Sequence, residues 1–254
     1  MAYQVQELAG LIRSASSVLV FTGAGMSTRS GIPDYRGPQG VWKRRQPVYL
    51  QDFLASAESR IEYWDYKLEG WAQFRDARPN PAHEALAELE RLGHLDTLVT
   101  QNIDGLHVAA GNSEARVVEI HGTNRFITCM TCGRRYENEP VFTAWTADRV
   151  VPLCEEEGCS GWLKPATISF GQSLDPDILE RSFEAARQAD LAISIGSSLV
   201  VEPAASVPLA AKQKGASYCI LNQGETAHDP ICDLRIDADA ADFLPRLIEA
   251  LDDR

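Results

Sequence analysis

The stretch VLVFTGAG, residues 18–25, decides the fold, because an apolar run ends there in a glycine turn. The run Val18 to Phe21 is typical of a strand buried on both faces, as strands of parallel sheets are. The turn Gly23-Ala24-Gly25 lets backbone amides approach a pyrophosphate ahead of a helix start. Thr28 stands where the dinucleotide fingerprint has its third glycine, so the turn taken alone leaves a purely structural role equally open.

Strand-like and helix-like segments alternate on both sides of this turn. A helix with apolar residues at helical spacing is expected at 3–16, and Asn80, Pro81 and Gly93 delimit another. The order predicts an α/β fold with a doubly wound, Rossmann-like parallel sheet. The expected strands are 18–21, 98–100, 117–120, 191–195 and 218–221, and the further helices are 81–92, 178–189, 203–213 and 241–251.

Two stretches interrupt the alternation, and we expect them to build a smaller second domain. In the first stretch, residues 37–79, glycine- and proline-rich sequence gives way to aromatic, helix-like sequence. In the second, residues 124–164, a cysteine cluster occurs in sequence with little helical periodicity. The predicted large domain then consists of 1–36, 80–123 and 165–254. The predicted small domain combines the helical insertion with a zinc ribbon.

Four of the six cysteines have the spacing of a zinc site. Cys129 and Cys132 form one turn-like pair, Cys154 and Cys159 form another, and 21 residues separate the pairs. Two such pairs complete a tetrahedral thiolate shell, which leaves no open position for chemistry, so one structural Zn²⁺ is predicted. The remaining two, Cys219 and Cys232, are expected to be packing residues.

Composition excludes some classes of protein and leaves others open. The 254-residue chain carries a formal net charge of −12, which argues against nucleic acid as the main ligand. The charge is compatible with lysine-rich substrates, although its simplest role is solubility. No apolar run is long enough to span a membrane, and the N-terminus lacks a secretory signal, so we expect a cytoplasmic protein without a membrane partner.

Several further motifs surround the glycine turn, in a fixed order along the chain. Together they resemble the sirtuin family from about residue 5 to residue 250, and this combination is very specific. The blocks are GAGMSTRSGIPDYRG at 23–37, TQNIDGLH at 100–107, HGT at 121–123, the four cysteines, LKP at 163–165, FG at 170–171, GSSL at 196–199, VEP at 201–203 and LN at 221–222.

The resemblance implies an enzyme that consumes NAD as a co-substrate to remove acyl groups from protein lysines. The products would be nicotinamide, O-acyl-ADP-ribose and free lysine. An NAD hydrolase or mono-ADP-ribosyltransferase on the same scaffold is the alternative. A binding module on an inactive nucleotide fold is disfavoured, because His121, Asn102 and Asp104 are all intact. A hydride-transferring dehydrogenase is opposed by the missing third glycine.

The resemblance also assigns roles to residues. His121, at the end of strand 117–120, would be the catalytic base, since imidazole exchanges protons near neutral pH. Asn102 and Asp104 would orient nicotinamide and ribose, with Ile103 as an apolar wall. The acylated lysine peptide would add a strand at Phe170, Gly171 and Val200. The implied NAD contacts are Gly23, Ala24, Gly25, Tyr35, Arg36, Gln101, Asn102, Ile103, Asp104, Gly196, Ser197 and Asn222.

Sirtuins that remove succinyl or malonyl groups carry a Tyr-x-x-Arg pair that holds the acyl carboxylate. Alignment on Trp64 and Asn80 puts Lys67 and Gly70 at these two positions. The sequence therefore predicts acetyl or longer uncharged acyl groups as substrates.

Overall fold

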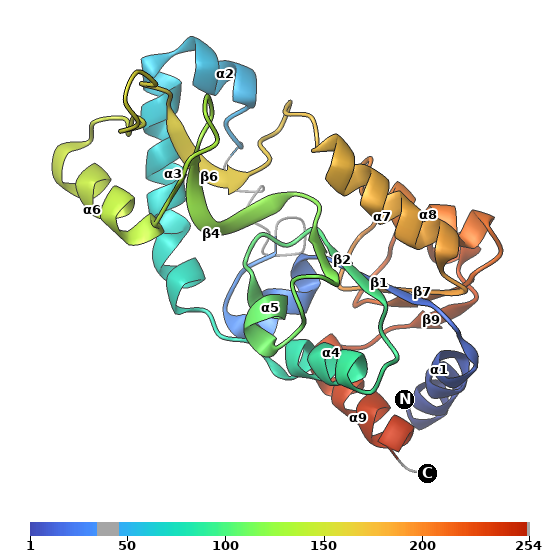
Figure 1. Ribbon diagram of the computed structural model, residues 1–254. Helices are drawn as coiled ribbons and strands as arrows, with labels where there is room; N and C mark the ends of the chain where they lie inside the picture. The colour runs from blue at the N-terminus through green and yellow to red at the C-terminus, as the bar shows by residue number, and fades with distance from the viewer. Residues whose placement is uncertain (35–45, 253–254) are drawn as a thin grey trace.

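A computed structural model describes residues 1–34 and 46–252 and centres on a six-stranded parallel sheet (Figure 1). The strand order is β3-β2-β1-β7-β8-β9. The predicted α/β fold is confirmed, and the five predicted strands are all present. The strands are β1 Val18–Thr22, β2 Thr97–Thr100, β3 Val117–Glu119, β7 Leu191–Ile195, β8 Ser217–Leu221 and β9 Leu234–Ile236.

The strand order reverses between β1 and β7, which lie side by side at the centre of the sheet. The chain proceeds from β1 outward to β2 and β3, and later from β7 outward to β8 and β9. Every residue of β1 and of β7 is buried, as the continuous apolar runs predict. Such a reversal opens a crevice at the carboxyl ends of the two central strands, where ligands of α/β folds bind.

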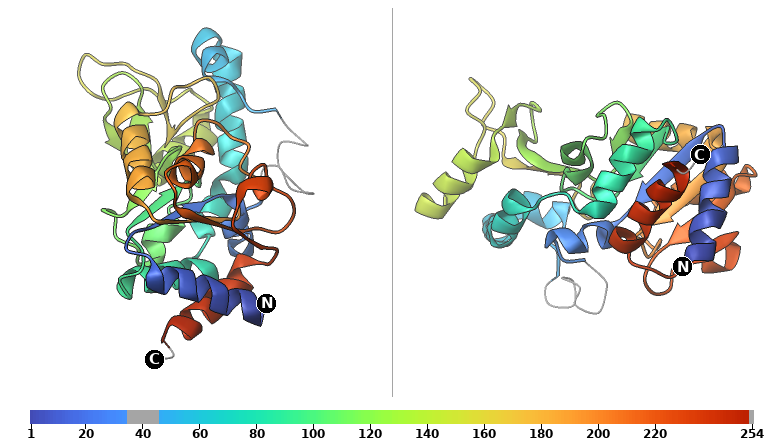
Figure 2. Two further views of the ribbon diagram at one scale, coloured as in Figure 1. Left: turned by 90° about the vertical axis from the view of Figure 1, so that its right-hand side faces the viewer. Right: turned by 90° about the horizontal axis from the view of Figure 1, so that it is seen from below.

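Helices cover both faces of this sheet, and alternate side chains of β1 point into two separate cores. Val18 and Val20 pack with α1, α4 and α9, while Leu19 and Phe21 pack with α7 and α8. Figure 2 shows α4, α9 and α1 lying together on one face. These helices span Ala2–Ser14 (α1), Pro81–Arg91 (α4), Pro176–Gln188 (α7), Ser206–Gln213 (α8) and Ala240–Asp252 (α9).

A smaller antiparallel sheet, in the order β5-β4-β6, lies at one end of the molecule beside three helices (Figure 1). A third hydrophobic cluster joins Phe53, Tyr63 and Trp64 to Phe142 and Trp145. This cluster connects two segments that are far apart in the sequence. Its elements are α2 Leu50–Ala55, α3 Ala57–Asp76, β4 Gly122–Cys129, β5 Arg135–Tyr136, α6 Asn138–Asp148 and β6 Leu163–Thr167.

Some elements differ from the expectations. A 3-10 helix, η1 Ala24–Ser30, begins within the glycine turn, and α6 forms where little helical periodicity was recognised. The helix α8 begins at Ser206, three residues after its predicted start. Two further short helices are α5 Leu106–Ala110 and η3 Asp229–Ile231. Within residues 1–34 and 46–252, no helix has both the length and the apolar character that a membrane span needs.

Candidate active site

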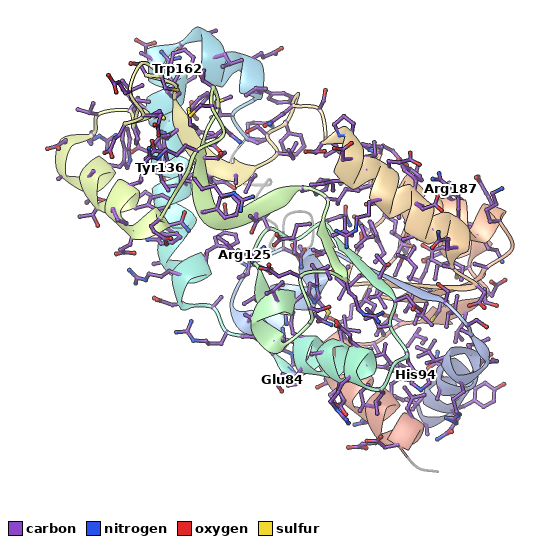
Figure 3. All side chains as sticks on the ribbon, in the orientation of Figure 1. Glu84, His94, Arg125, Tyr136, Trp162 and Arg187 are labelled. Atoms are coloured by element: carbon purple, nitrogen blue, oxygen red, sulfur yellow. The ribbon has the colours of Figure 1, made fainter. Side chains whose placement is uncertain are left out.

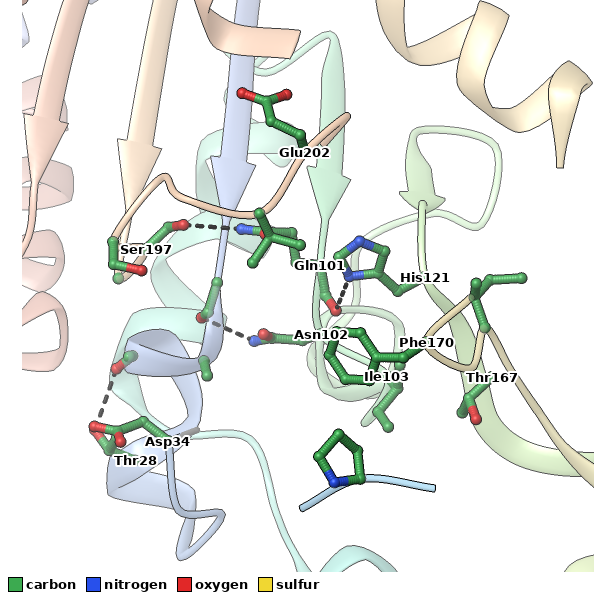
Figure 4. Close-up of a pocket in the computed structure, with 18 of the residues that line it drawn as sticks. Thr28, Asp34, Gln101, Asn102, Ile103, His121, Thr167, Phe170, Ser197 and Glu202 are labelled. Carbon is green, nitrogen blue, oxygen red and sulfur yellow. Dashed lines mark hydrogen bonds between the residues drawn. The ribbon is translucent and has the colours of Figure 1, made fainter. Parts of the chain in front are cut away.

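A cavity of about 1070 Å³ opens at the carboxyl ends of the central strands. It extends from the loops after β7 and β8 to the loop after β6, and Figure 4 shows Ser197 and Thr167 at its two sides. Most of the predicted NAD contacts within the described residues line this cavity. They are Gly23, Ala24, Gly25, Gln101, Asn102, Ile103, Gly196, Ser197 and Asn222.

The glycines of two loops interlock on one wall of the cavity. A Cβ added to Gly23 would lie 2.8 Å from the Gly196 carbonyl oxygen, and one added to Gly25 would lie 2.8 Å from the Gly196 Cα. Gly196 has a φ of 63°, and a Cβ there would lie 2.5 Å from the Met26 nitrogen. The loop after β1 therefore touches the loop after β7 through bare backbone, and any side chain at these glycines would push the two loops apart.

Asn102 is fixed by hydrogen bonds before any ligand binds. Its Nδ2 donates to the Gly23 carbonyl over 3.0 Å and to the Ser27 hydroxyl oxygen over 3.1 Å. The Ser27 hydroxyl in turn donates to Asp104 over 2.7 Å, and the Leu106 amide also donates to that carboxylate. Asp104 therefore holds the first residue of α5 and supports Asn102 through Ser27, and it is not among the residues that line the cavity. Burial raises the pKa of Asp104, while these hydrogen bonds oppose the rise.

A chain of buried polar side chains continues behind Ser27, and the sequence analysis did not identify it. The Thr22 hydroxyl contacts the Thr100 hydroxyl at 2.8 Å and the His107 Nε2 at 2.9 Å. The His107 ring lies 5.0 Å from that of His83, whose Nε2 is 3.5 Å from the Ser27 hydroxyl. Burial lowers the pKa of His83 to about 4 and that of His107 well below its ordinary value, so both rings are neutral.

His121 lies on the other side of the cavity, two residues after β3 ends. Its Nδ1 is 3.2 Å from the Gln101 carbonyl oxygen. Because a carbonyl only accepts, we assign the ring proton to Nδ1, which makes Nε2 the acceptor nitrogen of the neutral ring. The Gln101 side chain donates to the Ser197 hydroxyl over 2.9 Å and so links the two sides of the cavity (Figure 4).

The other predicted site residues that the structure describes do not all line the cavity. Phe170 and Gly171 line the cavity, whereas Val200 is 51% exposed and does not line it. The Asn222 side chain donates to two carbonyls of its own loop, those of Gln223 and Gly224. Tyr35 and Arg36 lie outside the described residues.

The four predicted zinc ligands meet at the far end of the molecule from the chain termini, where Figure 3 labels Tyr136 and Trp162. Their sulfurs lie within 4.8 Å of one another, with Cys129 3.6 Å from Cys159 and Cys132 3.6 Å from Cys154. A zinc–sulfur bond of about 2.3 Å places tetrahedral ligands roughly 3.8 Å apart, so the cluster fits one Zn²⁺. The amides of Thr131 and Cys132 donate to the Cys129 sulfur, as metal-bound thiolates require.

Outside this cluster, Cys219 is buried in the core of the large sheet and Cys232 is half-buried against it. The predicted packing role of both cysteines agrees with these positions.

Comparisons with known proteins identify the family. The sequence profile described as the Sir2 family matches residues 23–203. The NAD-dependent protein deacetylase of Rhodopseudomonas palustris is 43% identical over 240 residues, which cover 94% of each chain. NAD-dependent protein deacylase 1 of Archaeoglobus fulgidus is 37% identical, over 96% of each chain.

Comparison with solved structures identifies the same family. A Sir2 structure with a deacetylated p53 peptide and 3′-O-acetyl ADP ribose superposes with a TM-score of 0.89 at 36% identity, covering 96% of this chain and 97% of the other. A Sir2 complex with a p53 peptide and NAD⁺ gives a TM-score of 0.85 over 96% of each chain, also at 36% identity. By profile, by relatives and by structure, the chain belongs to the Sir2 family.

Proposed function

We propose that this chain removes acyl groups from protein lysines in a reaction that consumes NAD. The observation that carries the proposal is the joint placement of His121 and Asn102 in one cavity that is also lined by the interlocking glycines of two loops. The relatives named as NAD-dependent deacetylases and deacylases support it. NAD would supply a ribose carbon that the acyl oxygen attacks as nicotinamide leaves.

The glycine wall is the part of the cavity best suited to the pyrophosphate of NAD. Gly23, Gly25 and Gly196 let backbone approach a ligand closely, and Ser197 adds a hydroxyl beside them. Asn102 and Ile103 would hold the nicotinamide end, with Asp104 acting through Ser27. Gln101 and Asn222 would contact ribose hydroxyls, and Tyr35 and Arg36 remain predicted contacts.

His121 would accept a proton from a ribose hydroxyl. Its Nδ1–H is held by the Gln101 carbonyl, which fixes the ring orientation and leaves Nε2 as the basic atom. An imidazole positioned in this way accepts a proton near neutral pH and returns it later in the reaction. No other histidine of the described residues lines the cavity.

The acylated lysine would enter at Phe170 and Gly171, with the peptide extended toward Val200. The Leu50 amide, at the start of α2, donates to the Phe170 carbonyl over 2.9 Å and so helps to position the backbone after β6. Strand addition relies on main-chain hydrogen bonds and reads little sequence, which suits many protein substrates.

We further propose that residues 37–79 and 124–164 form a small domain on a large domain made of 1–36, 80–123 and 165–254. The third hydrophobic cluster supports this division, because it joins α3 to the segment that carries the cysteines. One structural Zn²⁺ on Cys129, Cys132, Cys154 and Cys159 would hold that segment. A cytoplasmic location stays a prediction, which cell fractionation tests.

The test is an incubation of the purified chain with NAD and an acetyl-lysine peptide, in which nicotinamide and peptide mass are followed together. Equal release of nicotinamide and loss of acetyl groups is expected. Nicotinamide release without acyl loss would make the chain an NAD hydrolase or ADP-ribosyltransferase instead.

A further inference from the structure

The loops that line the large cavity follow one another in the order in which NAD would lie across it. Asn102 comes after β2 and Asn222 comes after β8, while Gly23 and Gly196 come after β1 and β7. These strands are adjacent in the order β2-β1-β7-β8. With nicotinamide at Asn102 and the pyrophosphate at the two glycines, the adenosine half of NAD would reach the loop after β8. All four residues of that loop from Asn222 to Glu225 line the cavity.

The loop after β8 is held from behind by Arg235, a residue of β9. The Arg235 Nη1 donates to the Asn222 carbonyl over 2.9 Å and to the Ile236 carbonyl over 2.6 Å, and its Nη2 donates to the Gly224 carbonyl. Its Nε donates to Asp229 over 2.9 Å. A guanidinium presents its donors in a rigid planar fork, so Arg235 fixes these acceptors relative to one another.

Asp229 extends this hold to the far end of the same loop. Its carboxylate accepts hydrogen bonds from the Thr226 amide over 3.1 Å and from the Thr226 hydroxyl over 2.6 Å. The Gly224 amide makes only a longer contact of 3.4 Å with the Asp237 carboxylate. Arg235 therefore connects both ends of the loop to β9, directly at its start and through Asp229 at its end.

Arg235 shares one acceptor with the side chain of Asn222. The Asn222 Nδ2 donates to the Gln223 carbonyl over 2.9 Å and to the Gly224 carbonyl over 3.1 Å, and the Gly224 carbonyl also accepts from Arg235. Asn222 has to leave these carbonyls when its side chain turns toward a ribose hydroxyl. Because Arg235 still holds the Gly224 carbonyl, the loop keeps its shape while Asn222 changes partner.

We propose that Arg235 is a positioning residue for the adenosine half of NAD, which acts through the backbone of the loop after β8. This inference rests on the proposed function and deepens it. Arg235 is not among the residues that line the cavity, so its guanidinium serves the loop and not the ligand. A loop that is already ordered spares the ligand the cost of ordering it. The bond that breaks lies at the other end of the cavity, and Arg235 takes no part in that step.

The test compares the two ends of the cavity in Arg235→Met. Calorimetric binding of ADP-ribose should weaken about tenfold, the scale of one hydrogen bond to a charged group. The KM for NAD should rise by a similar factor while kcat stays within about threefold, because ground-state and transition-state binding are lost alike. Inhibition by nicotinamide, which would bind at Asn102, should stay within about twofold. Unchanged ADP-ribose affinity, or an equal loss for ADP-ribose and nicotinamide, would overturn the inference.

Two further variants separate geometry from charge. Arg235→Lys keeps the charge and loses the planar fork, so it should bind ADP-ribose as weakly as Arg235→Met. Full recovery in Arg235→Lys would mean that the charge acts on the phosphates, which would contradict the proposal. In an Asn222→Ala background, Arg235→Met should weaken ADP-ribose binding by less than about threefold, since the two residues act together. A full tenfold effect in that background would also contradict it.

Arg116→Met is the matched control. The Arg116 guanidinium likewise donates to two carbonyls of one loop, those of Leu95 and Asp96, and neither residue lines the cavity. This variant should lose similar stability and bind ADP-ribose as wild type does, and weakened binding in it would assign the effect to general destabilisation. Wild-type protein that binds ADP-ribose but leaves acetyl-lysine intact would count against the proposed function alone. Wild-type protein that does not bind ADP-ribose would overturn both.

Discussion

The two regions of this molecule that bind ligands are built in opposite ways. Around the cavity, Asn102, Ser27 and His121 are each held by hydrogen bonds within the protein. At the cysteine cluster, four sulfurs face one another at close distance and a metal is the partner that they fit. The difference indicates that the cavity can keep its shape without its ligand, whereas the cluster depends on its ion.

The largest expected effect tests the dependence on metal. Cys129→Ser should release zinc and destabilise the protein by on the order of 5 kcal/mol, since structural zinc contributes directly to folding. Zinc content and a urea unfolding curve are the measurements. Cys232→Ser, outside the cluster, is the matched control and should retain the metal. A zinc-free Cys129→Ser protein as stable as wild type would show that the cluster needs no ion.

The second-largest effect tests whether His121 contributes to catalysis and not to stability. His121→Ala should reduce kcat/KM for deacetylation by about 10²–10⁴-fold, because the base is lost, and leave the melting temperature and NAD binding close to wild type. His94→Ala, in the turn after α4, should change none of these values (Figure 3). Near-normal turnover in His121→Ala would remove His121 from the mechanism.

A smaller effect distinguishes the roles of Asn102 and Asn112, two buried asparagines whose side chains each donate two hydrogen bonds. Asn102→Ala should cost about a hundredfold in kcat/KM and about 1–3 kcal/mol of stability. Asn112 donates to the Leu86 carbonyl and to Glu90, so Asn112→Ala should lose similar stability and keep its activity. Similar losses of activity in both variants would mean that Asn102 acts only through folding.

Most of the fold was predictable because its signals are local. The apolar runs of β1 and β7 and the cap at Asn80 each lie within a few neighbouring residues. The strand β9 has three residues, too few for a pattern, and α6 buries only Asn138, Phe142 and Trp145 with no clear amphipathic period. Its partners come from α3, which the sequence of α6 does not reveal.

The residues of the cavity were likewise predictable where the signal is local and not where it depends on tertiary contacts. Gly23, Asn102 and His121 were predicted because each lies in a short contiguous motif that resembles those of the family. The chain from Thr22 to His107 was missed, because its hydrogen bonds depend on the register that pairs Thr22 with Thr100 across two strands. Threonines at the ends of adjacent predicted strands, followed by a histidine in the next helix, were the available signal.

A last comparison concerns acid, to which both regions are sensitive. His83 and His107 are neutral when folded, with pKa values below the unfolded value of about 6.5. The unfolded chain therefore binds more protons below that pH, and stability present above pH 6.5 is lost as the pH falls toward 4, by about 1.4 kcal/mol per unit and per histidine.

Urea midpoints between pH 7.5 and pH 4.5 measure this loss, with zinc content followed in parallel. His107→Gln keeps a polar group near Thr22 and removes one titrating ring, so its stability should fall less steeply with pH than that of wild type. An identical slope for the variant would assign the acid sensitivity to the cysteine cluster alone.

The third hydrophobic cluster has a consequence for synthesis on the ribosome. Trp64 of α3 is fully buried in a cluster that also includes Leu163, which is made about 100 residues later. At about 5–20 residues per second, the aromatic face of α3 stays without its partners for roughly 5–20 s in every round of translation. The nascent chain is therefore expected to depend on chaperones most in this interval, before the second pair of cysteines can join the first.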